Sequence, residues 1–528
     1  MSIQINNIKV PIETSVDELK RIGLKKLSKT EKDCISFKIL KQSVDARKKN
    51  VSFVYSLLFE LNDEKNINKN CDIFSIEKKE KKEPVFGNET LTNRPVVVGA
   101  GPAGLFCALS LARHGYRPIL IERGSNVEDR TRKVKNFWEN KILDTDSNVQ
   151  FGEGGAGTFS DGKLTTRIND EKINDVLRDF IKHGADEDIS YKAKPHIGTD
   201  VLATVVQNIR EEIIKKGGDV FFNTKLCRIH QKSGRIYKIT LSDGSEIETD
   251  VVCLAIGHSA RDTYEMLINE GIDMVLKPFS VGVRIEHLRE DIDKAMYGDF
   301  AGHPALGAAT YQLSYRRGSD RCYSFCMCPG GVVVQAASEE NTVVTNGMSY
   351  HARNETNSNS ALCVNVDERD FESSHPLSGI RFQQRLEKAA FILGGSNYCA
   401  PAQKFGDFLQ NKKTSSFGKI SPSFSCGVNG TDLHECLPRN VSRILKDAIP
   451  YFGTKIKGYD TFDAVMTGLE TRTSAPVRIL RNENGESTSL SGLYPCGEGA
   501  GYAGGIMSAA VDGLNIAEKI MCKFKPFE

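Results

Sequence analysis

The order of hydrophobic and polar positions in the first part of the chain predicts a small α/β module. The segments IKVPI and VSFVYSLLFEL have the apolar pattern of strands, and SVDELKRIGLKKL has the spacing of an amphipathic helix. The run SIEKKEKKEP that follows, at residues 75–84, is nearly all charged and cannot bury a core. We therefore predict an N-terminal module over residues 1–74 and a charged linker over residues 75–90.

The hydrophobic pattern changes within PVVVGAGPAGLFCALSLA, an uncharged run from Pro95 to Ala112 that is about as long as a membrane span. A β-branched run gives way to glycines and then to helix formers, which is typical of a buried strand, a tight turn and a helix. A second apolar strand, PILIE, follows and ends in Glu122. This order predicts a strand–helix–strand unit of a protein core and no transmembrane helix.

The turn inside this unit has the GxGxxG spacing of a dinucleotide site. Its first glycine permits the tight bend, its second lets a pyrophosphate approach the backbone, and its third lets the helix pack closely on the strand. The helix N-terminus offers free N–H groups and a positive dipole end to phosphate, and Glu122 is placed to accept hydrogen bonds from ribose hydroxyls. The predicted contacts are Gly99, Gly101, Pro102, Ala103, Gly104, Glu122 and Arg123.

The far end of the chain decides between FAD and NAD. The segment GLYPCGEGAGYAGGIMSAAVDGLNIAEKI, residues 492–520, contains a short strand, an acid, a glycine-rich turn and a helix. It resembles the flavoprotein superfamily that includes glutathione reductase, in which this acid contacts the ribityl chain and the helix N-terminus faces the flavin pyrimidine edge. A helix dipole and backbone N–H groups there stabilise the negative charge of a reduced flavin. The resemblance implies non-covalent FAD, held here by Glu498, Gly504, Gly505, Ile506 and Met507.

A further glycine-rich segment, EGGAGTFSDGKL at residues 153–164, nearly matches an ATP-binding P-loop. However, Leu164 follows Lys163 where a P-loop needs a hydroxyl to bind magnesium. In related flavoproteins a segment with this position and composition runs beneath the pyrophosphate and along the isoalloxazine. The resemblance implies that Lys163 brings a positive charge near the flavin or an acidic substrate. The implied cofactor contacts are Gly154, Gly155, Gly157, Thr158, Ser160 and Asp161.

The whole chain is similar to a family of poorly characterised bacterial FAD-dependent dehydrogenases, the NAD(FAD)-utilising dehydrogenase-like proteins. The shared motifs are GAGPAG, EGGAGTFSDGKL, YSFCMCPGG, TNGMS, ETRTSAPVRI and GEGAGYAGGI, and VVCLAIGHSARDT places Gly257 at the superfamily's glycine after a strand. The resemblance implies an α/β fold with a discontinuous Rossmann-like FAD-binding domain over residues 91–280 and 460–528. An inserted substrate or cap domain with a mixed or antiparallel β-sheet is expected over residues 281–459.

Two arginines are the first candidates for substrate binding. Arg472 and Arg478 lie in ETRTSAPVRI, just before the last FAD strand. Their guanidinium groups can grip a carboxylate or phosphate through two hydrogen bonds, or they can join loops by salt bridges. Asn346 in TNGMS and Lys163 complete the catalytic candidates, and His258 is a weaker one because a lone histidine after a strand is more often structural.

The cysteines predict neither a metal site nor a familiar dithiol relay. Cys322, Cys326 and Cys328 alternate in RCYSFCMC, so a regular strand would place them on one face, and both the Cys-X-X-Cys spacing and a fourth ligand are missing. The helix after GAGPAG contains only Cys107, which argues against the dithiol relay of glutathione reductase. We therefore expect a packed strand and no bound metal.

Composition and charge narrow the function further. The chain has 528 residues, and its 70 Lys and Arg nearly balance 68 Asp and Glu, so no broad attraction to nucleic acid or membranes is expected. The 14 cysteines form no regular framework, and the opening MSIQINNIKVPIE lacks the pattern of a secretory signal. We therefore expect reduced thiols in the cytoplasm. The sequence favours no oligomeric state.

These observations predict an FAD-dependent oxidoreductase that passes hydride through flavin N5 to or from an unidentified small molecule, anionic if the arginines form a clamp. No second complete dinucleotide unit is evident, so NAD(P)H is expected only as a transient reductant. One alternative is a tRNA-modifying flavoprotein, against which the near-zero net charge argues. Another is a non-catalytic flavin-binding protein for redox sensing or partner docking through the N-terminal module.

Overall fold

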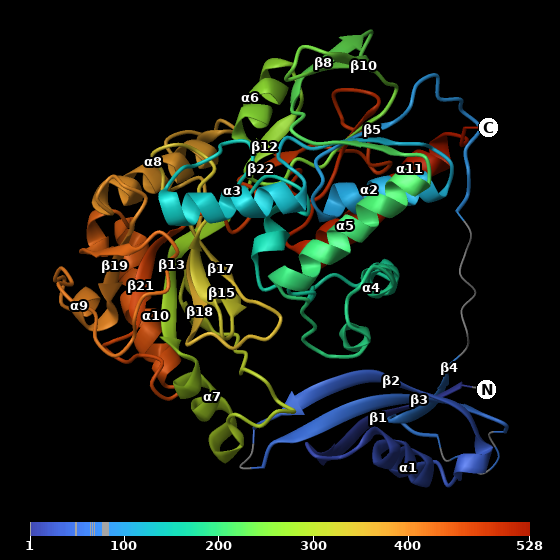
Figure 1. The fold of residues 1–528 in the computed structure, drawn as a ribbon, viewed down its shortest axis with the longest axis vertical. Helices are drawn as coiled ribbons and strands as arrows, with labels where there is room; N and C mark the ends of the chain where they lie inside the picture. The colour runs from blue at the N-terminus through green and yellow to red at the C-terminus, as the bar shows by residue number, and fades with distance from the viewer. Residues whose placement is uncertain are drawn as a thin grey trace.

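The computed structural model describes residues 2–47, 50–63, 65, 67, 69–76 and 84–527. The N-terminal module is an antiparallel sheet in the order β2-β3-β1-β4, with helix α1 packed on it (Figure 1). Ser15 accepts a hydrogen bond from the Glu18 N–H and caps α1, while Gly23 lies against the ring of Phe59. The elements are β1 (Ser2–Pro11), α1 (Val16–Lys26), η1 (Glu31–Asp33), β2 (Cys34–Asp45), β3 (Ser52–Leu61) and β4 (Ile73–Ile76). Residues 77–83 of the predicted linker lie outside the described residues.

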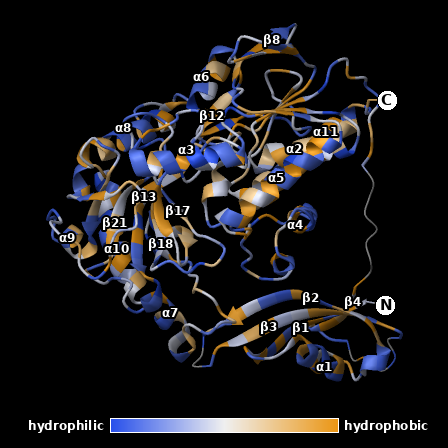
Figure 2. Cartoon of the chain, viewed as in Figure 1, coloured by the Kyte–Doolittle hydropathy of each residue, from blue (hydrophilic) through white to orange (hydrophobic). Residues whose placement is uncertain are grey.

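A five-stranded parallel sheet in the order β23-β11-β5-β6-β7 forms the centre of the FAD-binding domain. Alternate residues of its strands face different layers: Val97 packs toward the helices α2, α5 and α11, whereas Val96 and Val98 pack toward a three-stranded antiparallel sheet. Figure 2 shows that α2 and the sheet are mostly hydrophobic and that the outer helix α3 is mostly hydrophilic. This is the Rossmann-like α/β arrangement that the sequence predicts.

The bounds of the elements in this domain follow the expected motifs. The parallel strands are β5 (Val96–Val98), β6 (Ile119–Ile121), β7 (Asp219–Phe221), β11 (Val252–Leu254) and β23 (Leu493–Pro495). The antiparallel sheet contains β8 (Leu226–Lys232), β9 (Arg235–Leu241) and β10 (Glu246–Glu248). The helices are α2 (Pro102–Arg113), α3 (Val127–Asn140), η2 (Gly155–Phe159), α4 (Lys172–Lys182), η3 (Glu187–Ser190), α5 (Thr199–Lys215), α6 (Arg261–Asn269) and α11 (Ile506–Lys523).

The second domain is built on a seven-stranded mixed sheet in the order β14-β15-β18-β13-β21-β19-β20. All its pairings are antiparallel except that of β19 with β20. The strands are β13 (Phe279–Leu288), β14 (Ser314–Arg317), β15 (Asp320–Cys328), β18 (Asn357–Val366), β19 (Ala400–Lys404), β20 (Val428–Gly430) and β21 (Val465–Glu470). Its helices are α7 (Arg289–Tyr297), η4 (Gly298–Phe300), α8 (Ser378–Leu393), α9 (Phe405–Leu409), η5 (Leu433–Glu435) and α10 (Arg439–Gly453).

Two short antiparallel ribbons complete the fold. The ribbon of β12 (Met274–Leu276) and β22 (Val477–Ile479) lies where the chain enters and leaves the second domain. The ribbon of β16 (Val332–Gln335) and β17 (Thr345–Met348) belongs to the second domain. Because β21 pairs with β13, it belongs to the seven-stranded sheet. The boundary expected at residue 460 therefore moves past Glu470.

Candidate functional site

The dinucleotide turn after β5 contains glycines with different tasks. Gly99 has φ +101°, and a Cβ there would lie 2.4 Å from the carbonyl oxygen of Ala255. A Cβ on Gly104 would lie 1.8 Å from the carbonyl oxygen of Gly99, so packing within the protein excludes a side chain at both. Gly101 differs, because the nearest atom to a Cβ there is the Cα of Gly155 at 3.8 Å. The space beside Gly101 is therefore open to a ligand.

Glu122 lies buried at the end of β6 and organises the loops around this turn. Its carboxylate accepts hydrogen bonds from the backbone N–H groups of Ala100 (2.8 Å), Gly124 (2.9 Å) and Gly152 (2.9 Å). An ionised carboxylate has about four acceptor positions. Glu122 thus holds two glycine loops together and keeps an acceptor position for a ribose hydroxyl.

The second glycine-rich loop, residues 153–164, packs directly on the dinucleotide turn. The Gly154 N–H donates to the carbonyl oxygen of Ala100 at 2.8 Å, and a Cβ on Gly155 would lie 3.1 Å from the Cα of Gly101. A Cβ on Gly157 would lie 2.9 Å from the side chain of Ile506. This loop therefore lies between the N-termini of α2 and α11.

The polar side chains predicted as cofactor contacts are engaged within the protein. Thr158 is buried, its hydroxyl directed to the carbonyl oxygen of Glu153 (3.3 Å), and the Ser160 hydroxyl donates to Gly157 (2.7 Å). The buried Asp161 carboxylate accepts from the guanidinium of Arg353, with Nε at 2.9 Å. These side chains shape the loop, so the groups that it can offer a cofactor are mainly backbone atoms.

Arg123 is engaged in the same way. Its guanidinium pairs with Asp146 at 2.7 Å and Asp262 at 2.8 Å, and it lies 4.2 Å over the ring of Phe151. Because two carboxylates already accept hydrogen bonds from the Arg123 guanidinium, few of its N–H groups are left for a cofactor.

The third part of the site follows β23. Glu498 is partly exposed and accepts a hydrogen bond from the Gly505 N–H at 3.2 Å. Burial raises the pKa of Glu498 to about 7, and the positive charge of Lys277 opposes that rise. A Cβ on Gly504, Gly505 or Gly257 would meet no atom within 4 Å, so this region is also open. The side chains of Ile506 and Met507 are buried, which restricts these two to backbone contacts.

The donors and spaces present fit FAD. Gly101 and Gly505 begin α2 and α11 without a hydrogen bond from a capping side chain, so helix N-terminal N–H groups remain for phosphate and for the flavin edge. Pro102 at the start of α2 needs no N–H partner, and Ala103 packs its side chain against Gly497. Glu122 and Glu498 would hold the ribose and the ribityl chain. When bound, FAD supplies two-electron chemistry at N5 of its isoalloxazine.

Arg472 has a structural position, which corrects its assignment as a substrate clamp. Its Nε and Nη2 donate to Glu387 at 3.1 and 3.0 Å, and its Nη1 donates to Ser259 and Ser338 at 3.0 and 2.6 Å. Glu387 also accepts from Arg261 at 2.8 Å. Burial opposes the ionisation of Glu387, yet Arg261 and Arg472 hold its pKa well below the usual range. Arg472 therefore has little capacity left for a substrate.

Arg478 and Lys277 form a second cationic position, close to Glu498. Arg478 is exposed and lies 5.2 Å from the centre of the Tyr502 ring. The Lys277 Nζ has only long contacts, the nearest with Ser474 at 3.4 Å. Burial lowers the pKa of Lys277, Glu498 opposes that shift, and Arg478 adds to it. Neither cation has an ion-pair partner among the described residues.

The structure brings Lys163 and Asn346 to one region around Arg284. This fully buried arginine of β13 forms an ion pair with Glu470 at 3.0 Å and donates to Asn346 at 3.4 Å and to the carbonyl oxygen of Cys326 at 2.9 Å. Lys163 is partly exposed and helps to lower the pKa of Cys326. Asn346 and the Cys326 carbonyl therefore both contact Arg284, and Lys163 of the glycine loop pairs with Asp161 at 3.8 Å and interacts electrostatically with Cys326, whereas Arg472 pairs with Glu387.

Arg130 is a positioning residue that the sequence motifs do not indicate. It lies fully buried in α3 and donates to the carbonyl oxygens of Asn148 (2.9 Å), Val149 (2.9 Å) and Glu153 (2.6 Å). A Cβ on Gly152 would lie 2.4 Å from its side chain. The one available signal is an arginine inside a predicted helix just after the ribose-binding strand. Arg130 fixes the backbone that leads into the glycine loop.

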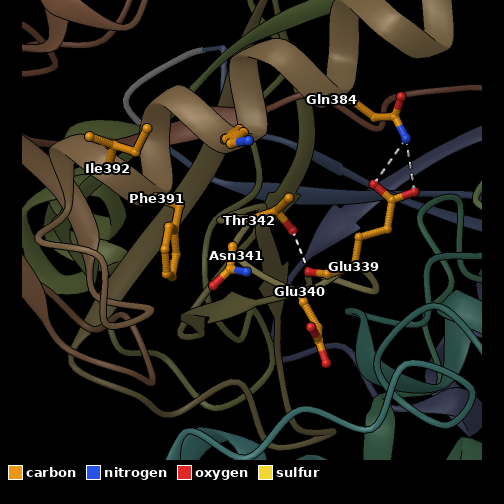
Figure 3. Close-up of a pocket in the computed structure, with 8 residues that line it drawn as sticks. Glu339, Glu340, Asn341, Thr342, Gln384, Phe391 and Ile392 are labelled. Carbon is orange, nitrogen blue, oxygen red and sulfur yellow. Dashed lines mark hydrogen bonds between the residues drawn. The ribbon is translucent and has the colours of Figure 1, made fainter.

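A surface depression of about 460 Å³ lies away from these loops (Figure 3). Figure 3 shows that residues 339–342 and helix α8 line it, with Gln384 hydrogen-bonded to Glu339. It contains none of the predicted site residues. Within the described ranges, no three His, Cys, Asp or Glu side chains gather as a metal site, and no helix has the length and apolar character needed to span a membrane.

Comparisons with known proteins agree with this arrangement. Residues 278–473 match a model described as the C-terminal domain-like region of FAD-dependent proteins, and residues 97–136 match an NAD(P)-binding Rossmann-like domain. Residues 2–60 match a domain of unknown function. The first match covers the seven-stranded sheet and the second covers the dinucleotide turn.

The solved structures to which this chain is similar are distant from it in sequence. Glycine oxidase from Bacillus cereus is 12% identical over 81% of this chain and 95% of its own, with a TM-score of 0.31. L-amino acid deaminase from Proteus vulgaris is 12% identical over 85% of this chain and 97% of its own, with a TM-score of 0.33.

A sequence relative is much closer. An uncharacterised protein of Clostridium beijerinckii is 50% identical over 540 residues, which cover 99% of both chains. This chain therefore belongs to the same family as the Clostridium beijerinckii protein, and it is an FAD-dependent flavoprotein with a Rossmann-like FAD-binding domain.

Proposed function

We propose that the protein is an oxidoreductase in which a small molecule exchanges a hydride with N5 of the bound flavin. One observation carries the proposal: the open cradle of the FAD-binding domain adjoins side chains from the seven-stranded sheet. Arg353, which lies between β17 and β18, donates to Asp161 of the glycine loop at 2.9 Å, and Cys326 of β15 interacts electrostatically with Lys163 of the same loop. Groups from both domains are thus within electrostatic range of one another at the cradle.

The positive charges around this position favour an anionic substrate. Lys163 is partly exposed and lies 3.8 Å from the Asp161 carboxylate, which Arg353 also holds, whereas Lys277 and Arg478 have no ion-pair partner among the described residues. A guanidinium can bind a carboxylate or phosphate through two hydrogen bonds, which an ammonium cannot reproduce. We therefore assign substrate recognition to Arg478 with support from Lys277, in place of Arg472. NAD(P)H, itself anionic, can use the same open side as a transient reductant.

The cysteines suggest a reducing compartment for this activity. All fourteen are free thiols, including the exposed Cys71, Cys227 and Cys522. Exposed and partly exposed thiols persist in the cytoplasm and are oxidised in secreted proteins. A cytoplasmic oxidoreductase therefore agrees with the thiol chemistry of the chain.

The test is anaerobic reduction of the FAD-loaded protein by NADH, NADPH and a panel of small carboxylates and phosphate esters. We expect at least one to bleach the oxidised flavin, and Arg478→Ala to lower kcat/KM by roughly ten- to a hundredfold because one charge-assisted contact is lost. The exposed Arg316 of β14 provides the control Arg316→Ala, which should have no effect. Failure of every reductant would favour a non-catalytic flavin protein, and full activity of Arg478→Ala would exclude the clamp.

A further inference from the structure

The end of β15 departs from a regular strand. Its register with β18 shifts between Phe325 and Cys328, and Cys326 within the bulge has φ +41°, a left-handed conformation that is uncommon for residues other than glycine. The shared face expected for Cys322, Cys326 and Cys328 is therefore lost at the bulge. Cys322 and Cys328 are buried, whereas Cys326 is partly exposed.

The bulge brings the two cysteines close together. The Cys328 thiol donates to the carbonyl oxygen of Cys326 at 3.4 Å, and the two thiols interact electrostatically. A partly exposed thiol is thus backed by a buried one. This is the arrangement that thiol–disulfide exchange requires, because the first thiol must meet a substrate and the second must reach the first.

Cations lie on both sides of this thiol pair. The Arg284 guanidinium donates to the carbonyl oxygen of Cys326 at 2.9 Å and lies 3.9 Å from the Cys328 sulfur. The partly exposed Lys163 adds positive charge from the glycine loop. The charged group that opposes them most directly is Glu470, which Arg284 already neutralises in an ion pair. The surroundings therefore favour a thiolate.

The electrostatics of the two cysteines differ accordingly. The neighbouring Cys328 thiol, with Lys163 and Arg284, lowers the pKa of Cys326 to about 6 against the effect of burial and of Glu470. The neighbouring Cys326 and burial raise the pKa of Cys328. Glu498 and Cys363 also interact electrostatically with Cys326. Of the two thiols, Cys326 is therefore the one whose surroundings favour the thiolate.

We propose that Cys326 and Cys328 are a redox-active thiol pair that exchanges with small-molecule disulfides. The Cys326 thiolate attacks a disulfide RSSR, which forms a mixed disulfide and releases one thiolate RS⁻. Cys328 then loses its proton and attacks the Cys326 sulfur, which closes the Cys326–Cys328 disulfide and expels the second RS⁻. The balance is two protein thiols and one RSSR converted to one protein disulfide and two RSH.

The location of the thiol pair gives the proposed function a substrate class, small-molecule disulfides. Cys326 interacts with Lys163 of the glycine loop and with Glu498, which are both expected beside the flavin. A reduced flavin and one proton can return two electrons to the protein disulfide, which regenerates both thiols. That last step rests on the proposed function, whereas the exchange itself needs only the protein thiols.

Peptide mapping tests the exchange on the FAD-loaded protein and on the FAD-free protein. Each is equilibrated with mixtures of reduced and oxidised glutathione, quenched in acid, alkylated and digested. We expect the peptide with Cys326 and Cys328 to lose two hydrogens as the oxidised fraction rises, while Cys322 and Cys363 remain reduced. Persistence of both thiols at every glutathione ratio would overturn the proposal.

Variants separate the two roles. Cys328→Ser should accumulate one glutathione on Cys326, because the resolving thiol is gone, and Cys326→Ser should accumulate none on Cys328. Cys322→Ser, a buried cysteine of the same strand, is the control and should still form the disulfide. Absence of the mixed disulfide in a folded Cys328→Ser protein would exclude Cys326 as the nucleophile.

A measurement on the wild-type protein does not depend on whether these variants fold. At pH 7 iodoacetamide should alkylate Cys326 about tenfold faster than the exposed Cys227, because Lys163 and Arg284 favour the Cys326 thiolate. Lys163→Gln should shift the pH profile of that rate upward. An equal rate at Cys227 together with an unshifted profile would reject the assignment. Flavin bleaching by NAD(P)H without disulfide formation would reject the thiol pair and retain the proposed function. Disulfide formation in a protein whose flavin no reductant bleaches would retain the thiol pair and reject the proposed function.

Discussion

At the residue scale, the glycines of the cofactor cradle fall into two kinds that the motif GxGxxG does not distinguish. Gly104 has no room for a Cβ because the carbonyl oxygen of Gly99 occupies that place. At Gly101, whose φ is −76°, and at Gly504, no protein atom lies close enough to exclude a Cβ. The first kind is required by the fold, and the second kind by a ligand that approaches the backbone.

This difference predicts opposite effects of two alanine substitutions. Gly104→Ala should lower the melting temperature of the FAD-free protein, because the new methyl group displaces α2 from β5. Gly101→Ala should leave that temperature within a few degrees of the wild type but weaken FAD binding, because its methyl group points into the open space. Thermal unfolding without FAD and a fluorescence titration with FAD measure the two effects. Equal FAD affinity of Gly101→Ala and the wild type would contradict a pyrophosphate at this glycine.

Glu498 predicts a pH dependence of stability. Burial raises its pKa from the usual 4.5 to about 7. The folded FAD-free protein therefore holds this proton more tightly than the unfolded chain, so Glu498 lowers the free energy of unfolding as the pH rises from 4.5 to about 7. In urea unfolding, Glu498→Gln should gain stability relative to the wild type between these pH values. The exposed Glu128 supplies the control Glu128→Gln. A stability difference that is independent of pH would contradict the shift.

At the element scale, α3 controls the glycine loop although it carries no recognised motif. The Arg130 guanidinium donates hydrogen bonds to backbone carbonyl oxygens between residues 148 and 153. Arg130→Met should leave these buried acceptors unpaired, at about 1–3 kcal/mol for each that water cannot reach. We expect faster hydrogen exchange in residues 148–160 and weaker FAD binding. Arg132→Met, on the exposed side of the same helix, is the matched control. Unchanged exchange in the Arg130 variant would show that the loop holds its shape alone.

The sequence predicts local elements well and long-range partners poorly. The valine strand, α2 and the strand that ends in Glu122 are adjacent in the chain, so their apolar pattern and glycine spacing suffice. The partners of Arg472 could not be inferred, since Glu387 and Ser338 come from distant segments that meet only in the folded protein. The bulge at Cys326 was hidden for a similar reason, because alternation alone implies a regular strand.

At the scale of the whole molecule, the buried cluster of Arg261, Glu387 and Arg472 joins the two domains. Arg261 belongs to α6 of the FAD-binding domain, Glu387 to α8 of the second domain, and Arg472 to the connection between them. The fold class and the FAD cofactor were predictable because recognisable motifs begin and end the FAD-binding domain. The cluster that holds the domains together was not, because charged residues in a sequence do not indicate their burial.

The cluster predicts how the molecule unfolds. Glu387→Gln leaves the buried Arg472 guanidinium without a counter-charge, while Arg261 keeps its ion pair with Glu339 at 2.8 Å. The loss should cost about 3–5 kcal/mol. Calorimetry should then show two transitions, or one at a markedly lower temperature, where the wild type shows more cooperative unfolding. Lys388→Gln alters the exposed neighbour of Glu387 on α8 and should leave the thermogram unchanged. A Glu387→Gln protein as stable as the wild type would contradict a joining role.

The position of β23 and α11 in the chain has a consequence for biosynthesis. α11 packs along α2, with a Cβ on Gly513 placed 2.2 Å from the carbonyl oxygen of Ala103, and β23 completes the edge of the parallel sheet beside β11 (Figure 1). A ribosome makes α2 early and α11 only after the entire second domain. The apolar side of α2 therefore lacks this partner during translation until α11 has been synthesised and has left the ribosome. The glycine turns that begin α2 and α11 come together only at that stage.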